Sequence, residues 1–326
     1  MRKFWFLFAF AIDLVAAEDF ADIYRSKGLE ALEIKANETL SDPSYWLERL
    51  QKIETRFGYF ESQKHILIVD KAARRLSFYD YKESKLTHIA DYDATMGDAV
   101  GDKFKAGDNK TPVGAYDIAS KLKQNGGGLY DPYYGPLAYV TNYPNAFDRM
   151  LKKTGHGIWL HGFPLNGSRQ NPNTKGCVAI DNEALSSLET QVDHKKIALL
   201  INENGVLEAR KEDIALVLAT IYKWRWTWKN NDLEGYLALY AKDFRRSDGI
   251  SRLDFDKIKR LIFGKGETKR IEFSDIEVVP YPNSLNELIY KASFWQDYKA
   301  RTHSSSRVKE LYLRKSGDRF EIALER

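Results

Sequence analysis

The chain has 326 residues, which is more than one hydrophobic core usually serves, so we expect two or three structural units. An apolar fraction of 43% supports globular folding. Charged residues make up 29% of the chain but balance to a formal net charge of +4, with no long basic run. This composition gives no support to nucleic-acid binding, and we expect no nucleic-acid partner.

The N-terminus has the pattern of a secretory signal peptide. Arg2 and Lys3 precede an apolar run that is broken only by Asp13 and ends in the small residues of 15–17. The run is shorter than the roughly 20 residues of a membrane span, so we expect no stable span after cleavage. An uncleaved N-terminal anchor is the alternative. Either way, the body of the protein is expected in the periplasm or outside the cell.

Residues 18–62 have a helical pattern, clearest in the second of two expected helices. Asp42 is suited to cap that helix and Pro43 to occupy its first turn. Its apolar face is expected to consist of Trp46, Leu50, Ile53 and Phe57.

From His65 the hydrophobic pattern changes to the alternation of β-strands. The expected strands cover 65–70, 75–81, 85–97, 111–118, 137–142, 157–161 and 196–201. Asp181 is expected to cap a short helix before the last of them. The stretch 63–207 is therefore predicted to be a β-rich unit.

The remaining residues, 208–326, predict an α+β unit. One helix carries an apolar face that includes Ile214 and Trp224, and a second begins at about Asp232. Four long alternating strands follow. This order resembles the NTF2-like fold, a cone in which a curved sheet wraps a helix and leaves a pocket. We expect that pocket to bind a ligand and thereby to position the substrate, although no residue identifies the ligand.

The stretch 156–180 carries the residues with the clearest chemistry. A cysteine hydrolase or transferase needs a thiolate, a nearby base and donors for the oxyanion. Cys177 is the only cysteine, and Gly176 before it allows a tight turn with backbone N–H groups near the reacting carbonyl. His161 ends an apolar strand, where the fold can hold its imidazole. An inert buried thiol is the alternative for this cysteine.

These residues form a pattern that resembles the YkuD-type L,D-transpeptidase family. The matching elements are the pair at 161–162 and Thr-Lys-Gly-Cys at 174–177. Upstream, Thr-Pro-Val-Gly at 111–114 and Met-Gly at 96–97 match further elements in the same order. The resemblance implies a β-rich catalytic core within a multi-domain chain.

By that resemblance, Cys177 attacks a stem-peptide carbonyl of peptidoglycan, and D-alanine leaves. His161 acts as the base and is oriented by the backbone carbonyl of Gly162. The N–H groups of Gly176 and Cys177 are the expected oxyanion donors. The mechanism requires no metal and no cofactor.

Other residues are assigned lesser roles by the same resemblance. Thr174 and Lys175 support the nucleophile, and Lys175, His156 and Tyr134 are candidate substrate-binding residues. Lys175 stands where the family often has His, and Ala179 where it often has Arg. A zinc site made of His156 with the two catalytic residues would lack the close ligand spacing of known zinc motifs, so we expect none.

The order of segments resembles the cell-shape-determining L,D-carboxypeptidases of helical bacteria. The expected segments of this chain are a signal peptide over 1–17, a helical segment over 18–62, a catalytic domain over 63–207 and an NTF2-like domain over 208–326. In that group the enzyme trims tetrapeptides to tripeptides, and the N-terminal helices can mediate homodimer formation. The predicted function is therefore periplasmic L,D-carboxypeptidase. An L,D-transpeptidase that forms cross-links, and a non-catalytic wall-binding scaffold, are the alternatives.

Overall fold

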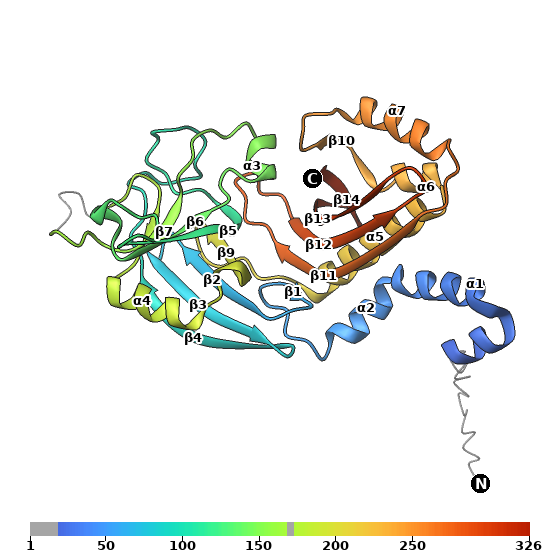
Figure 1. Cartoon of the computed structure of the whole chain (residues 1–326), viewed down its shortest axis with the longest axis horizontal. Helices are drawn as coiled ribbons and strands as arrows, with labels where there is room; N and C mark the ends of the chain where they lie inside the picture. The colour runs from blue at the N-terminus through green and yellow to red at the C-terminus, as the bar shows by residue number, and fades with distance from the viewer. Residues whose placement is uncertain (1–18, 168–172) are drawn as a thin grey trace, which may run out of the picture. The chain divides into compact units, whose positions relative to one another are not determined.

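The computed structural model describes residues 19–167 and 173–326 (Figure 1). The predicted signal peptide lies outside the described residues. The chain divides into two units, the first ending at Thr39 and the second spanning Leu40–Arg326. Helix α1 (Phe20–Leu40) is interrupted at Gly28, which has φ of 80° and is not helical. Within the described ranges, no helix combines the length and apolar character needed to cross a membrane.

Helix α2 (Pro43–Leu50) begins as expected, because Asp42 Oδ1 accepts a hydrogen bond from the Ser44 N–H at 2.9 Å. The prediction that the helix continues through Phe57 is wrong. The chain turns after Leu50 and passes Gly58, where φ is +137° and a Cβ would lie 2.6 Å from the Val278 carbonyl oxygen. The helix itself ends at Leu50, and after Gly58 the chain pairs with the strand that contains Val278.

The β-rich unit is one eight-stranded mixed sheet in the order β4-β3-β2-β9-β5-β6-β7-β8. Its strands are β2 (Lys64–Asp70), β3 (Arg75–Lys82), β4 (Lys85–Asp93), β5 (Gly114–Lys123), β6 (Leu137–Thr141), β7 (Trp159–His161), β8 (Val178–Ala179) and β9 (Ile197–Asn202). Its helices are η1 (Pro132–Tyr134), α3 (Ala146–Met150), α4 (Asn182–Gln191) and η2 (His194–Lys196). The pairs β2–β9 and β7–β8 are parallel and the others antiparallel. The predicted β-rich core is thus confirmed.

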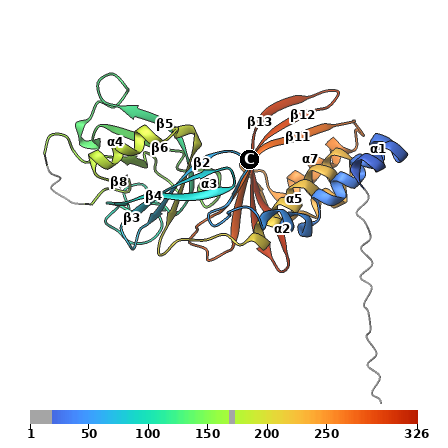
Figure 2. The ribbon, with the colours of Figure 1, turned by 90° about the horizontal axis from the view of Figure 1, so that it is seen from below.

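The C-terminal part is a six-stranded sheet in the order β1-β11-β12-β13-β14-β10, packed against helices (Figure 2). Its helices are α5 (Lys211–Lys229), α6 (Leu233–Leu237) and α7 (Arg252–Phe263). Its strands are β1 (Tyr59–Phe60), β10 (Tyr240–Arg246), β11 (Arg270–Pro280), β12 (Ile289–Lys299), β13 (Ser304–Ser316) and β14 (Arg319–Glu325). Apolar residues of α5 share one core with the inner face of this sheet. The α+β prediction is confirmed, although β10 and α7 were not expected.

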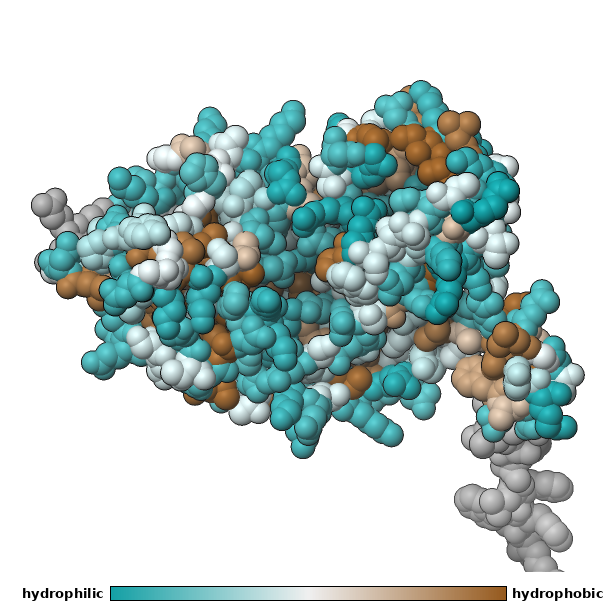
Figure 3. All heavy atoms as spheres, in the orientation of Figure 1, coloured by the Kyte–Doolittle hydropathy of each residue, from teal (hydrophilic) through white to brown (hydrophobic). Residues whose placement is uncertain are grey.

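Helix α7 has an unusual distribution of side chains. Its buried residues are Phe255, Lys259 and Phe263, so a lysine occupies the middle of the inward face. Leu253 and Leu261 are exposed on the same helix, and apolar side chains gather over it in the surface view (Figure 3). The apolar residues of α7 nevertheless recur at helical spacing, so the helix is amphipathic apart from the lysine on its inward face.

Buried polar contacts connect the two sheets. Asn145 Nδ2 donates to the Tyr281 hydroxyl at 2.9 Å, and Lys291 Nζ donates to Asp117 Oδ2 at 2.7 Å. Burial disfavours the Lys291 ammonium, but Asp117 and Glu310 outweigh this effect and hold the pKa of Lys291 well above its usual value. The lysine therefore stays charged and fixes β12 to β5.

Candidate active site

The pairing of β7 with β8 brings the two predicted catalytic residues to neighbouring segments. His161 is the last residue of β7 and pairs in parallel with Ala179. Cys177 directly precedes β8, and its Sγ contacts the backbone of Gly157 and Trp159, at the start of the strand that ends at His161.

The Cys177 thiol is held by the backbone of the neighbouring segment. Its Sγ accepts a hydrogen bond from the Trp159 N–H at 3.4 Å and lies 3.3 Å from the Gly157 carbonyl oxygen, to which the thiol donates. The side chain is only partly buried. The nucleophile candidate is thus fixed in position and still accessible.

Thr174 organises the turn that carries the cysteine. Its hydroxyl donates to the Cys177 carbonyl oxygen at 2.7 Å and accepts from the Gly176 N–H at 3.0 Å. Gly176 has φ of +135°, and a Cβ there would lie 2.7 Å from the Lys110 carbonyl oxygen, so only glycine fits. The Gly176 N–H is engaged by Thr174, which differs from its expected role as an oxyanion donor.

His161 is 1% exposed and has a defined orientation. Its Nδ1 lies 2.7 Å from the Gly162 carbonyl oxygen. A carbonyl can only accept, so Nδ1 carries a proton and Nε2 is the nitrogen able to take one. The Tyr134 ring packs edge-on against the imidazole at a centroid distance of 5.0 Å. The histidine therefore has the tautomer that a general base requires.

The turn after His161 is held by a residue that the sequence did not single out. The Gly162 N–H donates to the Tyr134 carbonyl oxygen at 3.0 Å. Asn182 Oδ1 accepts from the Phe163 N–H at 2.8 Å, and Asn182 Nδ2 donates to the Phe163 carbonyl oxygen at 3.1 Å. No sequence signal marked Asn182, because its role depends on α4 starting beside the end of β7.

The upstream elements of the pattern meet the nucleophile turn. The Gly97 N–H donates to Thr111 Oγ1 at 3.0 Å, and the Thr174 N–H donates to the Met96 carbonyl oxygen at 2.8 Å. These contacts explain why separated sequence elements occur together: each supports the position of the next.

The other candidate substrate-binding residues are less well placed. Tyr134 contacts His161, whereas His156 and Lys175 are exposed. His156 lies before β7 begins and is not part of that strand. Within 19–167 and 173–326, no group of three or more His, Cys, Asp or Glu residues is arranged to hold a metal ion.

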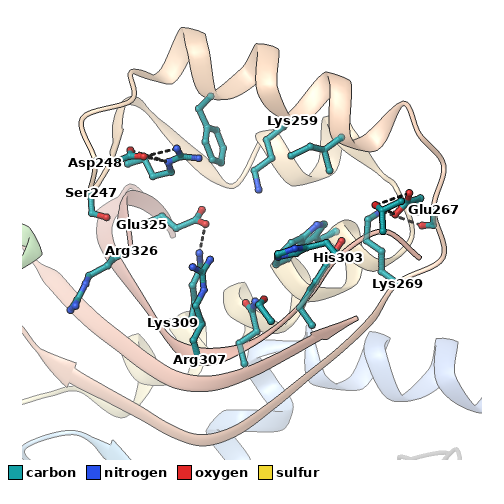
Figure 4. Close-up of a pocket in the computed structure, with 18 of the residues that line it drawn as sticks. Ser247, Asp248, Lys259, Glu267, Lys269, His303, Arg307, Lys309, Glu325 and Arg326 are labelled. Atoms are coloured by element: carbon teal, nitrogen blue, oxygen red, sulfur yellow. Dashed lines mark hydrogen bonds and ion pairs between the residues drawn. The ribbon is translucent and has the colours of Figure 1, made fainter. Parts of the chain in front are cut away.

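The C-terminal part contains a second candidate site, a cavity of 610 Å³ between α7 and the sheet (Figure 4). Seven Lys or Arg residues line it, against three Asp or Glu. Gln296 Oε1 and Trp228 Nε1, on two lining residues, are buried and have no hydrogen-bond partner among the described residues. The cavity therefore has positive charge and unused hydrogen-bonding groups.

Lys259 is the most unusual residue of this cavity. It is 8% exposed, and its Nζ lies 4.9 Å from the ring centroids of Trp228, Tyr236 and Phe255. Figure 4 shows it pointing from α7 into the cavity, toward the ion pair of Lys309 and Glu325. Burial lowers the pKa of Lys259 to about 8, and the nearby carboxylate only partly opposes this.

Glu325 is held in its charged form by its surroundings. Desolvation alone would raise its pKa, but Lys309 and Lys259 outweigh it and bring the pKa to about 2. The Tyr240 hydroxyl also donates to Glu325 Oε2 at 2.6 Å. Lys309 forms the ion pair with this carboxylate, whereas Lys259 acts on it only at longer range, which leaves the Lys259 charge for a ligand.

Comparisons with known proteins agree with this two-part architecture. Residues 64–199 match the L,D-transpeptidase catalytic domain, and residues 216–326 match the Cds6 C-terminal NTF2-like domain. A comparison with curated proteins found no match.

Three solved structures are similar over most of the chain. The helical cell shape determining protein Pgp2 of Campylobacter jejuni is 35% identical, with a TM-score of 0.80, and the match covers 88% of this chain and 99% of that one. A point mutant of the same Campylobacter protein is 34% identical with a TM-score of 0.82 over the same shares. Bd1075 of Bdellovibrio bacteriovorus is 27% identical with a TM-score of 0.65, covering 83% and 96%. The chain therefore belongs to the family of Pgp2, in which an L,D-transpeptidase catalytic domain is followed by an NTF2-like domain.

Proposed function

We propose that this protein is a periplasmic peptidoglycan L,D-carboxypeptidase that removes the terminal D-alanine from stem tetrapeptides and thereby influences cell shape. The observation that carries the proposal is the arrangement at β7 and β8. The Cys177 thiol contacts the start of the strand that ends at His161, and the Gly162 carbonyl holds His161 in the tautomer of a base. Membership in the Pgp2 family supports the wall as the substrate.

The proposed reaction begins with proton transfer from the Cys177 thiol to His161 Nε2. The thiolate attacks the carbonyl before the terminal D-alanine, and the carbon–nitrogen bond breaks as the imidazolium gives its proton to the leaving amine. The product is a thioester on Cys177. Water, deprotonated by the same imidazole, then releases the tripeptide. The Gly162 carbonyl oxygen accepts a hydrogen bond from His161 Nδ1–H throughout, which stabilises the imidazolium.

We assign the oxyanion to the Cys177 N–H. The Gly176 N–H is an unsuitable donor in this conformation, because Thr174 already accepts it. The contribution of Thr174 is then to hold the turn at the angle that presents the next N–H. Loss of one oxyanion donor typically costs about 10²- to 10³-fold in kcat, so this turn matters to the rate.

Similarity over the whole chain favours hydrolysis over transpeptidation. The catalytic residues would serve either a water or an amine acceptor, but similarity to a cell-shape determinant extends over 88% of the chain and includes the C-terminal domain. A scaffold without catalysis would have no need for a histidine in a fixed tautomer beside an accessible thiol. The proposed signal peptide, periplasmic location and homodimer, and the boundaries at 62/63 and 207/208, remain predictions.

We also propose that the C-terminal cavity binds an anionic group of the cell wall, such as a stem-peptide carboxylate. The supporting observation is Lys259, a buried ammonium with no hydrogen bond or ion pair to any described residue. A carboxylate entering the cavity would pair with this ammonium and neutralise its charge. Binding at this site would position the peptidoglycan for cleavage at the catalytic domain.

The catalytic proposal is tested with purified disaccharide-tetrapeptide and its cross-linked dimers, analysed by mass spectrometry beside a Cys177→Ala control. Loss of one D-alanine from the monomer, absent in the control, is the expected result. New dimers formed with release of D-alanine would instead identify a transpeptidase. Identical profiles for both proteins would support the scaffold.

Wall binding is tested separately by co-sedimentation with purified peptidoglycan in the Cys177→Ala background, where no cutting interferes. Lys259→Met should reduce the bound fraction. Lys257→Met, on the exposed side of α7, is the matched control and should bind normally. Equal binding by both variants would remove the cavity from the proposal.

A further inference from the structure

One peptide group at the active site forms hydrogen bonds to side chains on its two opposite edges. The peptide plane between Gly162 and Phe163 contains the carbonyl of the first residue and the N–H of the second, which point in opposite directions when the bond is trans. His161 Nδ1 lies 2.7 Å from that carbonyl oxygen. Asn182 Oδ1 accepts the N–H at 2.8 Å. The carboxamide, the peptide and the imidazole thus form one continuous chain of hydrogen bonds.

The carboxamide of Asn182 is held in turn by its own second bond. Its Nδ2 donates to the Phe163 carbonyl oxygen at 3.1 Å, so the side chain binds Phe163 on both its N–H and its C=O. This pair of bonds fixes the rotation of the amide group. As a result, the plane of the neighbouring peptide is fixed as well.

Two glycines leave the space that this side chain fills. A Cβ at Gly162 would lie 2.1 Å from Asn182 Oδ1, and a Cβ at Gly135 would lie 2.6 Å from the same oxygen. Gly135 has φ of +76°, a conformation that other residues rarely adopt. The turn after His161, the end of η1 and the start of α4 therefore converge on one carboxamide.

From this geometry we infer that Asn182 is a positioning residue for the catalytic histidine. It acts through the Gly162–Phe163 peptide, whose carbonyl it aims at His161 Nδ1, and this inference rests on the proposed function of Cys177 and His161. Hydrogen bonds in a chain polarise one another, so acceptance of the Phe163 N–H also makes the Gly162 carbonyl a better acceptor. A better acceptor favours the imidazolium that forms when the thiol is deprotonated.

The chain offers a matched control one residue away. Asp181 caps α4 by accepting the N–H groups of Glu183 and Ala184 at 2.8 and 3.3 Å, and no described contact joins it to the 161–163 turn. Asp181→Ala should weaken the helix start by about 1 kcal/mol. It therefore reproduces any general loosening of α4 without touching the Gly162–Phe163 peptide.

The test compares Asn182→Ala with Asp181→Ala and the wild type by the pH dependence of Cys177 alkylation with iodoacetamide, followed by mass spectrometry. This readout needs no peptidoglycan, so it separates failure of the inference from failure of the proposed function. In Asn182→Ala we expect half-maximal alkylation at a higher pH, because the imidazolium that stabilises the thiolate is less well held. Asp181→Ala should retain the wild-type profile.

Steady-state kinetics on the tetrapeptide provide the second readout. A misaligned base should lower kcat of Asn182→Ala about 10- to 100-fold and leave KM within about twofold. The inference is overturned if the alkylation profile of Asn182→Ala matches the wild type, or if Asp181→Ala shifts it equally. A folded Asn182→Ala protein with unchanged kcat would overturn it as well.

Discussion

Replacing Lys259 with methionine should make the protein more stable while weakening its binding to the wall. The side chain is 8% exposed and its ammonium lies among three aromatic rings. Its pKa falls from an ordinary 10.5 to about 8 because burial disfavours the charge. That difference corresponds to about 3 kcal/mol of unfavourable free energy in the folded state at neutral pH. Methionine keeps an unbranched side chain up to the ε position and removes the charged ammonium group.

The sign of this effect depends on pH in a defined window. Below about pH 8 the lysine is charged in both the folded and unfolded states, so the folded protein bears the full cost. Between about pH 8 and 10.5 the folded state loses the proton first, and stability rises with pH. Above 10.5 both states are neutral and the cost is gone. The advantage of methionine should therefore be largest at neutral pH and shrink toward pH 10.

Urea unfolding at pH 7 and at about pH 10 measures both predictions. Lys259→Met should raise the free energy of unfolding at pH 7 by up to about 3 kcal/mol. Lys257→Met, an exposed residue of the same helix, should change it by less than about 0.5 kcal/mol. A Lys259→Met protein that is less stable than the wild type at pH 7, or equally favoured at both pH values, would refute the reasoning.

Three further substitutions follow from the contacts. Gly162→Ala should abolish activity and lower the melting temperature, since its Cβ would lie 2.1 Å from Asn182 Oδ1; thermal melts and turnover of tetrapeptide measure both. Glu325→Gln should cost about 3 to 5 kcal/mol at neutral pH, because it leaves buried ammonium groups unpaired. Because the Glu325 pKa is lowered to about 2, the stabilisation by this carboxylate is present above about pH 4.5 and is lost as the pH falls toward 2. The difference in unfolding free energy between the wild type and Glu325→Gln should therefore disappear near pH 2. Tyr134→Ala should lower kcat by removing the ring that packs against His161, whereas Tyr134→Phe should keep it; a kcat of Tyr134→Ala equal to the wild type would contradict this.

Local signals in the sequence were sufficient for most of the fold. The caps at Asp42 and Asp181 and the alternation of the long strands depend on nearest neighbours, and the structure has them. Helix α7 was not predicted, although its apolar residues recur at helical spacing and the Ser251 side chain caps it by accepting the Asp254 N–H. Strand β10 was missed because its partner β14 lies about 80 residues later in the chain. Long-range strand pairing is therefore the part of this fold that local patterning does not specify.

The candidate site divides along the same line. Cys177 and His161 stand in a dense local pattern, and the pairing of β7 with β8 brings their segments side by side. Asn182 carries no such pattern, since an asparagine after a helix cap is ordinary in sequence. The use of the Gly176 N–H by Thr174 likewise depends on the angle of one turn. Hydrogen-bond direction is a property of the assembled turn, and composition does not determine it.

The two sites place opposite demands on the fold. At the catalytic site, His161 Nδ1 is hydrogen-bonded to the Gly162 carbonyl and the Phe163 N–H to Asn182, so the base is fixed at little cost to stability. In the C-terminal cavity, Lys259 is buried without an ion pair of its own, at a cost of about 3 kcal/mol. A buried charge with such a cost is retained where a ligand neutralises it. The cavity thus binds the cell wall, and the cysteine cleaves the peptide bond. Cys177→Ala should therefore retain wall binding, and Lys259→Met should retain turnover of small soluble tetrapeptide.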